Sequence, residues 1–259
     1  MRLTVLGSGS AFSAAGHNAS YCIDGRLLVD CGSPAQFLLP EAGQQLDDVE
    51  AILLTHFHAD HTAMLPVVLG ARALTADNPR PLRLAGPPGT REYVSRLVHT
   101  GYGGHLYGLI VDRLGLETTV LQDGAEADVC GYRVRAHAVV HSTGPSLAYS
   151  VQDRHGASVG FSGDSTMCAG LRRAISQSQL MVCECTGWEQ PIPSHLWWGE
   201  VSELIDAHPD TRFLLSHLTE RRQVRGALLA HDLLTLDVQP VGTALPEPPE
   251  TVRAARKGD

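Results

Sequence analysis

The stretch that decides the fold is Thr55-His56-Phe57-His58-Ala59-Asp60-His61, which places three imidazoles and a carboxylate within six positions. Residues 51–54 before it form an apolar run, which is typical of a strand buried on both faces. Residues 62–73 after it have the apolar spacing of a helix. The polar side chains are therefore predicted to lie on a strand-to-helix turn, where they can converge on one point.

These side chains have the chemistry of metal ligands. Neutral imidazole nitrogens and ionised carboxylates are the ligands that borderline divalent metals such as zinc prefer. The alternative is a polar turn whose histidines only cap the following helix, but that explains poorly why four such groups occur within six positions. The stretch therefore predicts a metal site.

The H-x-H-x-D-H arrangement resembles the signature of the metallo-β-lactamase superfamily. The resemblance implies that His56 and His58 bind one metal ion and that Asp60 and His61 bind a second. Asp30, in Asp30-Cys31-Gly32, resembles the Asp-x-Gly that supports the metal loop in this superfamily. A plain turn carboxylate is the alternative for Asp30.

Three more polar residues each end an apolar run later in the chain, namely His141, Asp164 and His217. Any one of them alone is more typical of a turn. In the superfamily these positions supply the third ligand of the first metal, the bridging carboxylate and the last ligand of the second metal. The resemblance implies two ligand groups that share Asp164: His56, His58 and His141 for one ion, and Asp60, His61 and His217 for the other.

Two metal ions about 3.5–4 Å apart can share a water molecule and lower its pKa towards ~7. We therefore expect a dinuclear metal-dependent hydrolase that attacks through a metal-bridging hydroxide, with Asp60 among its catalytic residues. Zinc is the first expectation because of the imidazoles, and manganese or iron are the alternatives.

Glu184 at a strand end and His195 downstream of it resemble a pair in the ribonuclease Z-like phosphodiesterase branch. There the histidine acts as a general acid and the carboxylate orients it. The alternative is that Glu184 caps a strand and His195 only precedes a helix. Arg221, four positions after His217, is a candidate to hold a phosphate oxygen, or else part of a solvated helix face.

The order of apolar runs predicts two β-rich halves, each covered by helices. Together with the resemblance, this implies an α/β (α+β) fold, a four-layer αβ/βα sandwich of metallo-β-lactamase type, over residues 1–245. Residues 246–259 are expected to be a flexible tail. Residues 101–108 are predicted to form a loop, either a mobile one over a substrate, with Tyr102, His105 or Tyr107 in contact with it, or an ordinary connector. Helices are predicted at residues 169–176, 198–207 and 223–234, and strands at 180–184 and 236–241.

The composition is that of a globular protein, with 43% hydrophobic and 19% charged residues. No apolar run approaches the roughly 18 residues that a membrane span needs, so we expect a cytoplasmic protein with no membrane partner. The six cysteines lack a C-x-x-C pair, which favours reduced thiols over a zinc ribbon or a redox motif.

The formal net charge of −8 argues against broad attraction to nucleic acid. Ribonuclease Z usually inserts a long arm for transfer RNA between the strand-end histidine and the bridging aspartate, but here residues 141 and 164 are only 23 positions apart. These observations disfavour transfer RNA and favour a small-molecule substrate, a small or cyclic phosphodiester or another ester. They are compatible with a homodimer.

Two other functions stay open at this point, and a third is disfavoured. A lactonase or thioesterase of the same fold has a better leaving group and does not need His195 as an acid. A non-catalytic module could bind a nucleotide or a sugar phosphate without turnover. A diiron redox protein is disfavoured, because such proteins usually replace one histidine ligand by a carboxylate and add a flavin domain.

Overall fold

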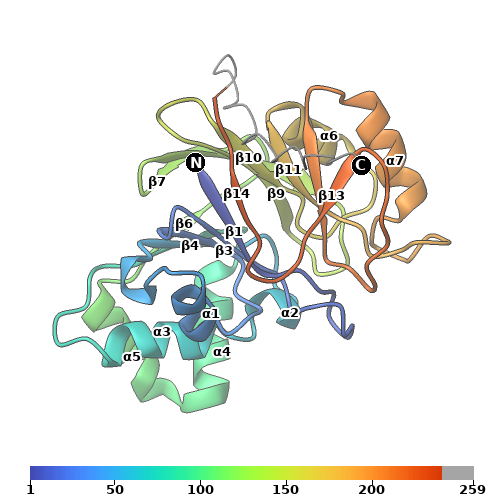
Figure 1. Cartoon of the computed structure of the whole chain (residues 1–259). Coiled ribbons are helices and arrows are strands. Elements are labelled where there is room, and N and C mark those ends of the chain that lie inside the picture. The colour runs from blue at the N-terminus through green and yellow to red at the C-terminus, as the bar shows by residue number, and fades with distance from the viewer. Residues whose placement is uncertain (241–259) are drawn as a thin grey trace, which may run out of the picture.

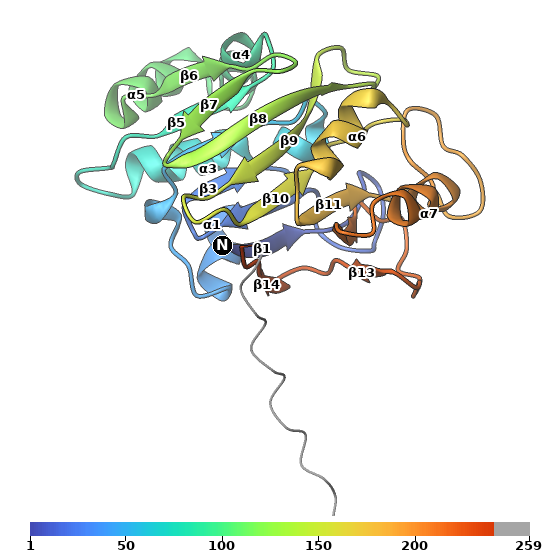
Figure 2. The ribbon, with the colours of Figure 1, turned by 90° about the horizontal axis from the view of Figure 1, so that it is seen from above.

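Two seven-stranded sheets form the middle of the molecule (Figure 1). The computed structural model describes residues 1–240. The first sheet contains, from edge to edge, β14 (Thr235–Asp237), β1 (Arg2–Gly7), β2 (Ser20–Ile23), β3 (Leu27–Val29), β4 (Ala51–Leu53), β5 (Arg83–Gly86) and β6 (Glu117–Val120). Figure 2 shows β14 beside β1, so the first and last described strands are neighbours.

The second sheet is built from the later part of the chain. It contains, in spatial order, β13 (Ala227–Leu229), β12 (Arg212–Ser216), β11 (Leu180–Glu184), β10 (Ser158–Phe161), β9 (Ser146–Gln152), β8 (Tyr132–Val139) and β7 (Glu126–Val129). Strands β10, β11 and β12 pair in parallel. Their residues are almost all buried, as expected for parallel strands that are covered on both faces.

Helices cover the outer face of each sheet. Figure 1 shows one group below the first sheet and another at the upper right. The first group contains α1 (Ala35–Glu41), α2 (Ala59–Thr62), α3 (Leu65–Leu74), α4 (Thr90–Tyr102) and α5 (Gly104–Leu114), with a 3-10 turn at Leu46–Asp48. The second group contains α6 (Ala169–Ser176) and α7 (Trp198–Ala207).

Three apolar clusters separate these layers. The central cluster joins the inner faces of the two sheets, for example Val5 and Leu53 with Val134 and Phe161. A second cluster packs the first sheet on its helices, and a third packs the second sheet on α6 and α7. The order is therefore helix, sheet, sheet, helix, which confirms the predicted four-layer αβ/βα sandwich.

The two sheets meet at the edge where several strands end. The carboxyl ends of β10, β11 and β12 lie together because these strands are parallel. The backbone N–H of Leu147, on β9, donates to the carbonyl of Thr55, directly after β4, at 3.0 Å. Loops that follow strands of both sheets are thereby brought to one place.

The helix predicted at residues 223–234 is wrong. This segment contains the short strand β13, which pairs in parallel with β12. Gly226 lies in the left-handed region at φ 85°, a conformation that ends helical geometry and that glycine adopts without strain. The apolar residues of the segment thus extend a sheet edge. The strand predicted at 236–241 is confirmed only in part, as β14 ends at Asp237 and residue 241 lies outside the described residues.

The loop predicted at residues 101–108 is also wrong. Helix α4 continues to Tyr102, and α5 begins at Gly104. Gly103, at φ 81°, allows the chain to reverse between the two helices. Leu106, Ile110 and Leu114 then recur every fourth residue and face the core, a helical period that the glycines of the segment obscured.

Other predicted elements agree closely. The helices expected at 169–176 and 198–207 and the strand at 180–184 have the predicted bounds. Strands β5 and β7 were not predicted, and β7 is mostly exposed at a sheet edge. Within residues 1–240, no helix has the length and apolar character to cross a bilayer. The predicted tail, 246–259, lies outside the described residues.

Candidate metal centre

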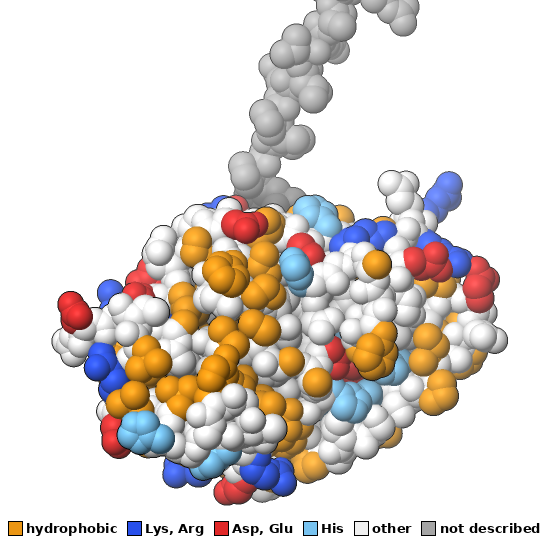
Figure 3. Space-filling model, turned by 90° about the horizontal axis from the view of Figure 1, so that it is seen from below, with side chains coloured by type: hydrophobic (Ala, Val, Ile, Leu, Met, Phe, Trp, Pro, Cys, Tyr) orange, Lys and Arg blue, Asp and Glu red, His pale blue; other side chains and the backbone are white. Residues whose placement is uncertain are grey.

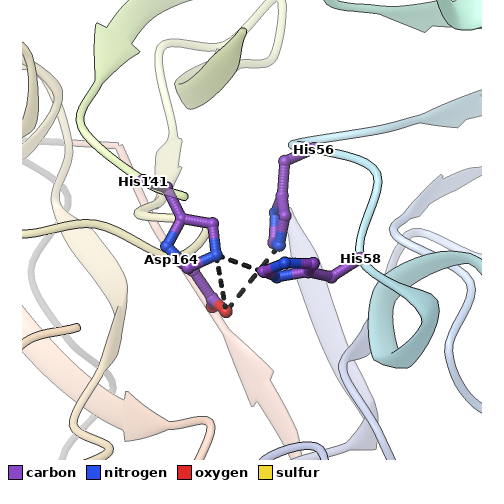
Figure 4. Close-up of side chains that lie close together, drawn as sticks. All are labelled: His56, His58, His141 and Asp164. Carbon is purple, nitrogen blue, oxygen red and sulfur yellow. Dashed lines mark hydrogen bonds and ion pairs between the residues drawn. The ribbon is translucent and has the colours of Figure 1, made fainter. Parts of the chain in front are cut away.

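The seven predicted metal ligands come together at the edge where the sheets meet. His56 and His58 follow β4, and Asp60 and His61 lie in the short helix α2. The other three lie one to three positions after strands of the second sheet: His141 follows β8, Asp164 follows β10 and His217 follows β12. Figure 4 shows the rings of His56, His58 and His141 pointing toward the carboxylate of Asp164. One loop and one short helix that follow β4 of the first sheet thus face three loops of the second.

His56, His58 and His141 form one potential ligand group with Asp164, because their ligand atoms all lie within 4.8 Å of one another. His141 Nε2 and His58 Nδ1 are 2.9 Å apart. The nearer oxygen of Asp164 lies 3.7 Å from His56 Nε2 and 3.8 Å from His141 Nε2. This group is open to solvent on the side of His58, which is partly exposed.

Asp60, His61 and His217 form the second group, again with Asp164. His217 Nε2 lies 3.0 Å from an Asp60 oxygen and 3.4 Å from one oxygen of Asp164. His61 Nε2 lies 3.3 Å from the other oxygen of Asp164. One oxygen of Asp164, Oδ2, therefore lies near both groups, and the other, Oδ1, lies near His61 of the second group.

Outer contacts fix which ring nitrogen faces the centre. The Thr55 hydroxyl donates its only proton to Asp30 at 2.8 Å, so its oxygen accepts from His56 Nδ1–H at 3.0 Å. Asp30 also accepts from His61 Nδ1–H at 2.7 Å. In their neutral form both rings therefore turn an Nε2 lone pair toward the centre, the tautomer that a metal ligand needs. Asp30 thus makes the supporting contact that its resemblance implied.

Hydrogen bonds from neighbouring groups orient the histidine rings of the second sheet in the same way. The Thr186 hydroxyl donates to Glu184 at 2.7 Å and accepts from His217 Nδ1–H at 2.8 Å. His141 Nδ1–H donates to the carbonyl of Ser194 at 2.8 Å. Their Nε2 lone pairs face inward as well. Four imidazoles thus arrive at the centre with the same tautomer.

Buried polar atoms without hydrogen-bond partners mark the point where these groups meet. They are His56 Nε2, His61 Nε2 and both oxygens of Asp164. An unpaired buried polar atom costs on the order of 1–3 kcal/mol, and a buried charge costs more. Lone pairs that face a buried carboxylate attract a cation, not another acceptor. The donor set therefore fits divalent metal ions of the zinc type.

The ionisation of the ligands follows from their surroundings. Burial lowers the pKa of His56 well below its usual value, which keeps its ring neutral. Burial acts in the same direction on His61, but the carboxylates of Asp164 and Asp30 outweigh it and raise its pKa. Burial alone would raise the pKa of Asp164, yet the charges of His217 and His61 hold it well below its usual value. The centre therefore keeps its carboxylate ionised.

The loop that supports the first sheet's ligands is tightly packed. A Cβ placed on Gly32 would lie 1.7 Å from the carbonyl oxygen of Asp60, so only glycine allows this approach. Asp30 and His217 both have positive φ, at 55° and 53°. Such conformations cost of order 1–3 kcal/mol in non-glycine residues and occur where function requires them.

His195 and Glu184 lie beside the second ligand group. His195 Nδ1–H donates to Glu184 at 3.0 Å and lies 3.7 Å from Asp164. Glu184 is buried, and its other oxygen accepts from the Ser165 N–H at 2.6 Å, which fixes the carboxylate. Burial alone would lower the pKa of His195, but the hydrogen bond and charge of Glu184 raise it. The ring is therefore oriented and holds its proton more firmly than free imidazole.

A family model described as "Beta-lactamase superfamily domain" matches residues 25–218. The chain belongs to the metallo-β-lactamase superfamily. It is 32% identical over 155 residues to a Ribonuclease Z of Methanosarcina acetivorans, covering 58% of this chain and 48% of that one. It is also 32% identical over 183 residues to a Ribonuclease Z of a Mycobacterium species, covering 66% and 64%.

A solved structure with the same fold is the short form of human tRNase Z. It superimposes with a TM-score of 0.72 at 21% identity and covers 92% of this chain and 99% of that one. The present chain spans about half to two thirds of the length of the two curated relatives. Their names agree with the metal-dependent hydrolase and the ribonuclease Z-like branch that the sequence predicted.

The expected partner is wrong. The sequence favoured a small-molecule substrate over transfer RNA, whereas the matched relatives are named Ribonuclease Z and tRNase Z. The 23-residue interval between His141 and Asp164 only excludes an insertion at that one place. The charge of −8 is a sum over the whole chain and does not describe the surface around the metal centre.

Arg221 was a candidate to hold a phosphate oxygen. Its guanidinium donates to the Ser8 hydroxyl at 2.9 Å and to the carbonyl of Ala230 at 3.2 Å. It therefore braces the loop after β1 in this member of the superfamily. The alternative reading as part of a helix face is wrong, since residues 223–234 form no helix.

Sequence reasoning missed three residues that support the centre, namely Thr55, Thr186 and Ser194. Each lies within two positions of a predicted site residue, but a hydroxyl or carbonyl at such a position has no distinctive pattern. Only the folded structure shows that the hydroxyls of Thr55 and Thr186 each bridge the ring of a proposed ligand and a carboxylate. Tyr102 and His105, two candidates for contact with a substrate, are exposed on α4 and α5.

Proposed function

We propose that this chain is a metal-dependent phosphodiesterase that cleaves RNA, with a transfer-RNA precursor as the first substrate to test. The names of the matched relatives support the RNA substrate. We propose two ions, with zinc first and manganese or iron as alternatives. The cleaved bond is the P–O bond of a phosphodiester, and water supplies the oxygen that replaces the leaving group.

In this proposal the two ligand groups each hold one ion and share Asp164. The set is His56, His58 and His141 for one ion, and Asp60, His61 and His217 for the other. When bound, such ions lower the pKa of a shared water and neutralise charge that develops on a phosphoryl oxygen. The carboxylate of Asp60 lies beside His217. It would therefore add negative charge to the site of the second ion.

His195 would act on the leaving group. An alkoxide that departs from a phosphodiester is a poor leaving group and needs a proton. The His195 Nδ1–H is held by Glu184, so Nε2 is the atom from which the ring would deliver a proton. The pairing favours a phosphodiester over a lactone or thioester, whose leaving groups need less help.

One observation carries the proposal: two ligand groups share Asp164, and a third cluster adds the Glu184–His195 pair to the same carboxylate. Metal ligands and a carboxylate-oriented imidazole therefore surround one point. A binding module without turnover has no need for a proton donor at that place.

We expect the zinc-loaded chain to cut an end-labelled precursor transfer RNA and to release a shorter labelled fragment. Removal of metal with EDTA should abolish the release, and added zinc, manganese or iron(II) should restore it. Gel electrophoresis of the labelled RNA measures both. Intact RNA with all three metals, in preparations that do cleave methyl p-nitrophenyl phosphate, would contradict the RNA substrate while leaving the metal chemistry in place.

A further inference from the structure

Phe12 is a fully exposed aromatic side chain at the corner of a turn after β1. The turn is closed by the Ser13 N–H, which donates to the Ser10 carbonyl at 3.1 Å. A phenyl ring in water leaves apolar surface that would gain on the order of 1.5–3 kcal/mol if fully covered. A partner that covers the Phe12 ring would therefore gain binding free energy.

The turn that carries Phe12 is firmly attached. The Ser10 N–H and the Ser13 hydroxyl both donate to the Leu218 carbonyl, at 3.0 and 2.7 Å. Leu218 directly follows the ligand His217, and its own N–H donates to the Ser8 carbonyl at 2.9 Å. The ring thus projects from a support that is connected to the metal centre.

Asp232 braces the same loop from the other side. One of its oxygens accepts from the Ser8 N–H and hydroxyl, at 3.1 and 2.8 Å, and the other accepts from the His17 N–H at 2.8 Å. Arg221 adds its bond to the Ser8 hydroxyl. A preformed support of this kind lowers the ordering cost of binding.

Two cavities adjoin Phe12. One has a volume of about 380 Å³ and reaches His58 and Asp60, and the other has about 430 Å³ and reaches Thr186 and Ile192. They share four lining residues, namely Ala11, Phe12, His195 and His217. Figure 3 shows His and acidic side chains around a hollow on this face, with a hydrophobic side chain beside them. Phe12 therefore stands where two clefts meet beside the metal centre.

The lining chemistry indicates how a substrate is held there. A phosphodiester carries two substituents, and two clefts that diverge from His195 and His217 can take one each. Among the described residues that line the two cavities there is no Lys or Arg. The groups flanking the phosphate must therefore be recognised by contacts other than ion pairs. Every nucleobase offers a π-face, and stacking on an aromatic ring needs no sequence preference.

We propose that Phe12 is the platform on which a nucleobase next to the scissile phosphate stacks. The inference rests on the proposed RNA substrate and adds a specific contact to it. The ring binds the substrate before and during the reaction alike, so its loss should raise KM more than it lowers kcat. It takes no part in the metal centre or in proton transfer.

The test compares Phe12→Ala, Phe12→Leu and Phe12→Trp with wild type, all metal-loaded, on precursor transfer RNA and on methyl p-nitrophenyl phosphate. Phe12→Ala should lower kcat/KM on the RNA about 10- to 100-fold, mainly through KM. Phe12→Leu, which keeps apolar bulk without a ring, should lose as much, and Phe12→Trp should stay within about threefold. The small ester has no nucleobase, so all variants should cleave it within about twofold of wild type.

A second measurement reads binding without activity. The indole introduced by Phe12→Trp should be quenched by mature transfer RNA, beyond the quenching of the three native tryptophans in wild type. Phe12→Ala at wild-type efficiency on RNA, full rescue by Phe12→Leu, or equal losses on both substrates would each overturn the stacking role. A wild type that cleaves the small ester but no RNA would instead overturn the proposed function, and this inference with it.

Discussion

Replacing Asp164 with asparagine is expected to lower kcat/KM on any phosphodiester by at least about 10³-fold, because metal-ion charge stabilisation contributes several kcal/mol. Asp164 is the only carboxylate common to both ligand groups among the described residues. The amide keeps the shape of the side chain and removes its charge, so each ligand group loses its shared anion. Metal content per chain, measured by mass spectrometry after dialysis, should fall together with activity.

The melting temperature of this variant, measured with and without zinc, distinguishes a role of Asp164 in metal binding from a role in folding. In EDTA, Asp164→Asn should melt below the wild-type temperature, because the variant loses the attraction to His217 and His61 that holds the pKa of Asp164 well below its usual value. With zinc, wild type should gain stability through binding and the variant should gain less. Asp206→Asn, on the exposed face of α7, is the matched control and should change neither property. Wild-type metal content in Asp164→Asn would contradict the shared-ligand role.

Replacing His195 with alanine is expected to lower kcat/KM on RNA about 10²- to 10⁴-fold, the range of general acid catalysis. The same variant should cleave methyl p-nitrophenyl phosphate within about threefold of wild type, since nitrophenolate leaves without a proton. The ratio of the two rates is the measurement. It isolates proton donation from binding and metal content.

Controls for His195→Ala come from the same chain. His155 lies in an exposed turn between β9 and β10, and His155→Ala should leave both rates unchanged. Metal content should stay at the wild-type level, because the two proposed ligand groups do not include His195. Equal losses on both substrates would assign His195 to the metal centre, and an unchanged RNA rate would remove it from the mechanism.

The convergence of the seven proposed metal ligands could be predicted because they occupy positions with strong local signals. His141, Asp164 and His217 lie one to three positions after β8, β10 and β12, and these strands run in the same direction, so their carboxyl ends gather at one edge of the sheet. The H-x-H-x-D-H turn adds spacing to that signal. A side chain fixed to a strand end is located by the topology of the sheet, so its place follows once the fold is known.

Contacts between distant loops left no such signal. Ser13 and Leu218 lie 205 positions apart, and their hydrogen bond appears only when the two loops fold together. Phe12 likewise reads as an ordinary loop residue in the sequence. The errors at 101–108 and 223–234 arose where glycines interrupt a pattern. A glycine with positive φ joins two helices in the first case and ends helical geometry in the second.

The most direct test of the central claim is the position of metal ions in a crystal of the zinc-loaded chain, located by anomalous scattering at the zinc edge. We expect two peaks per chain, one bound by His56, His58 and His141, the other by Asp60, His61 and His217, and both contacting Asp164. A single peak, or zinc held instead by Glu184 and His195 with Asp164 and His217, would contradict the account.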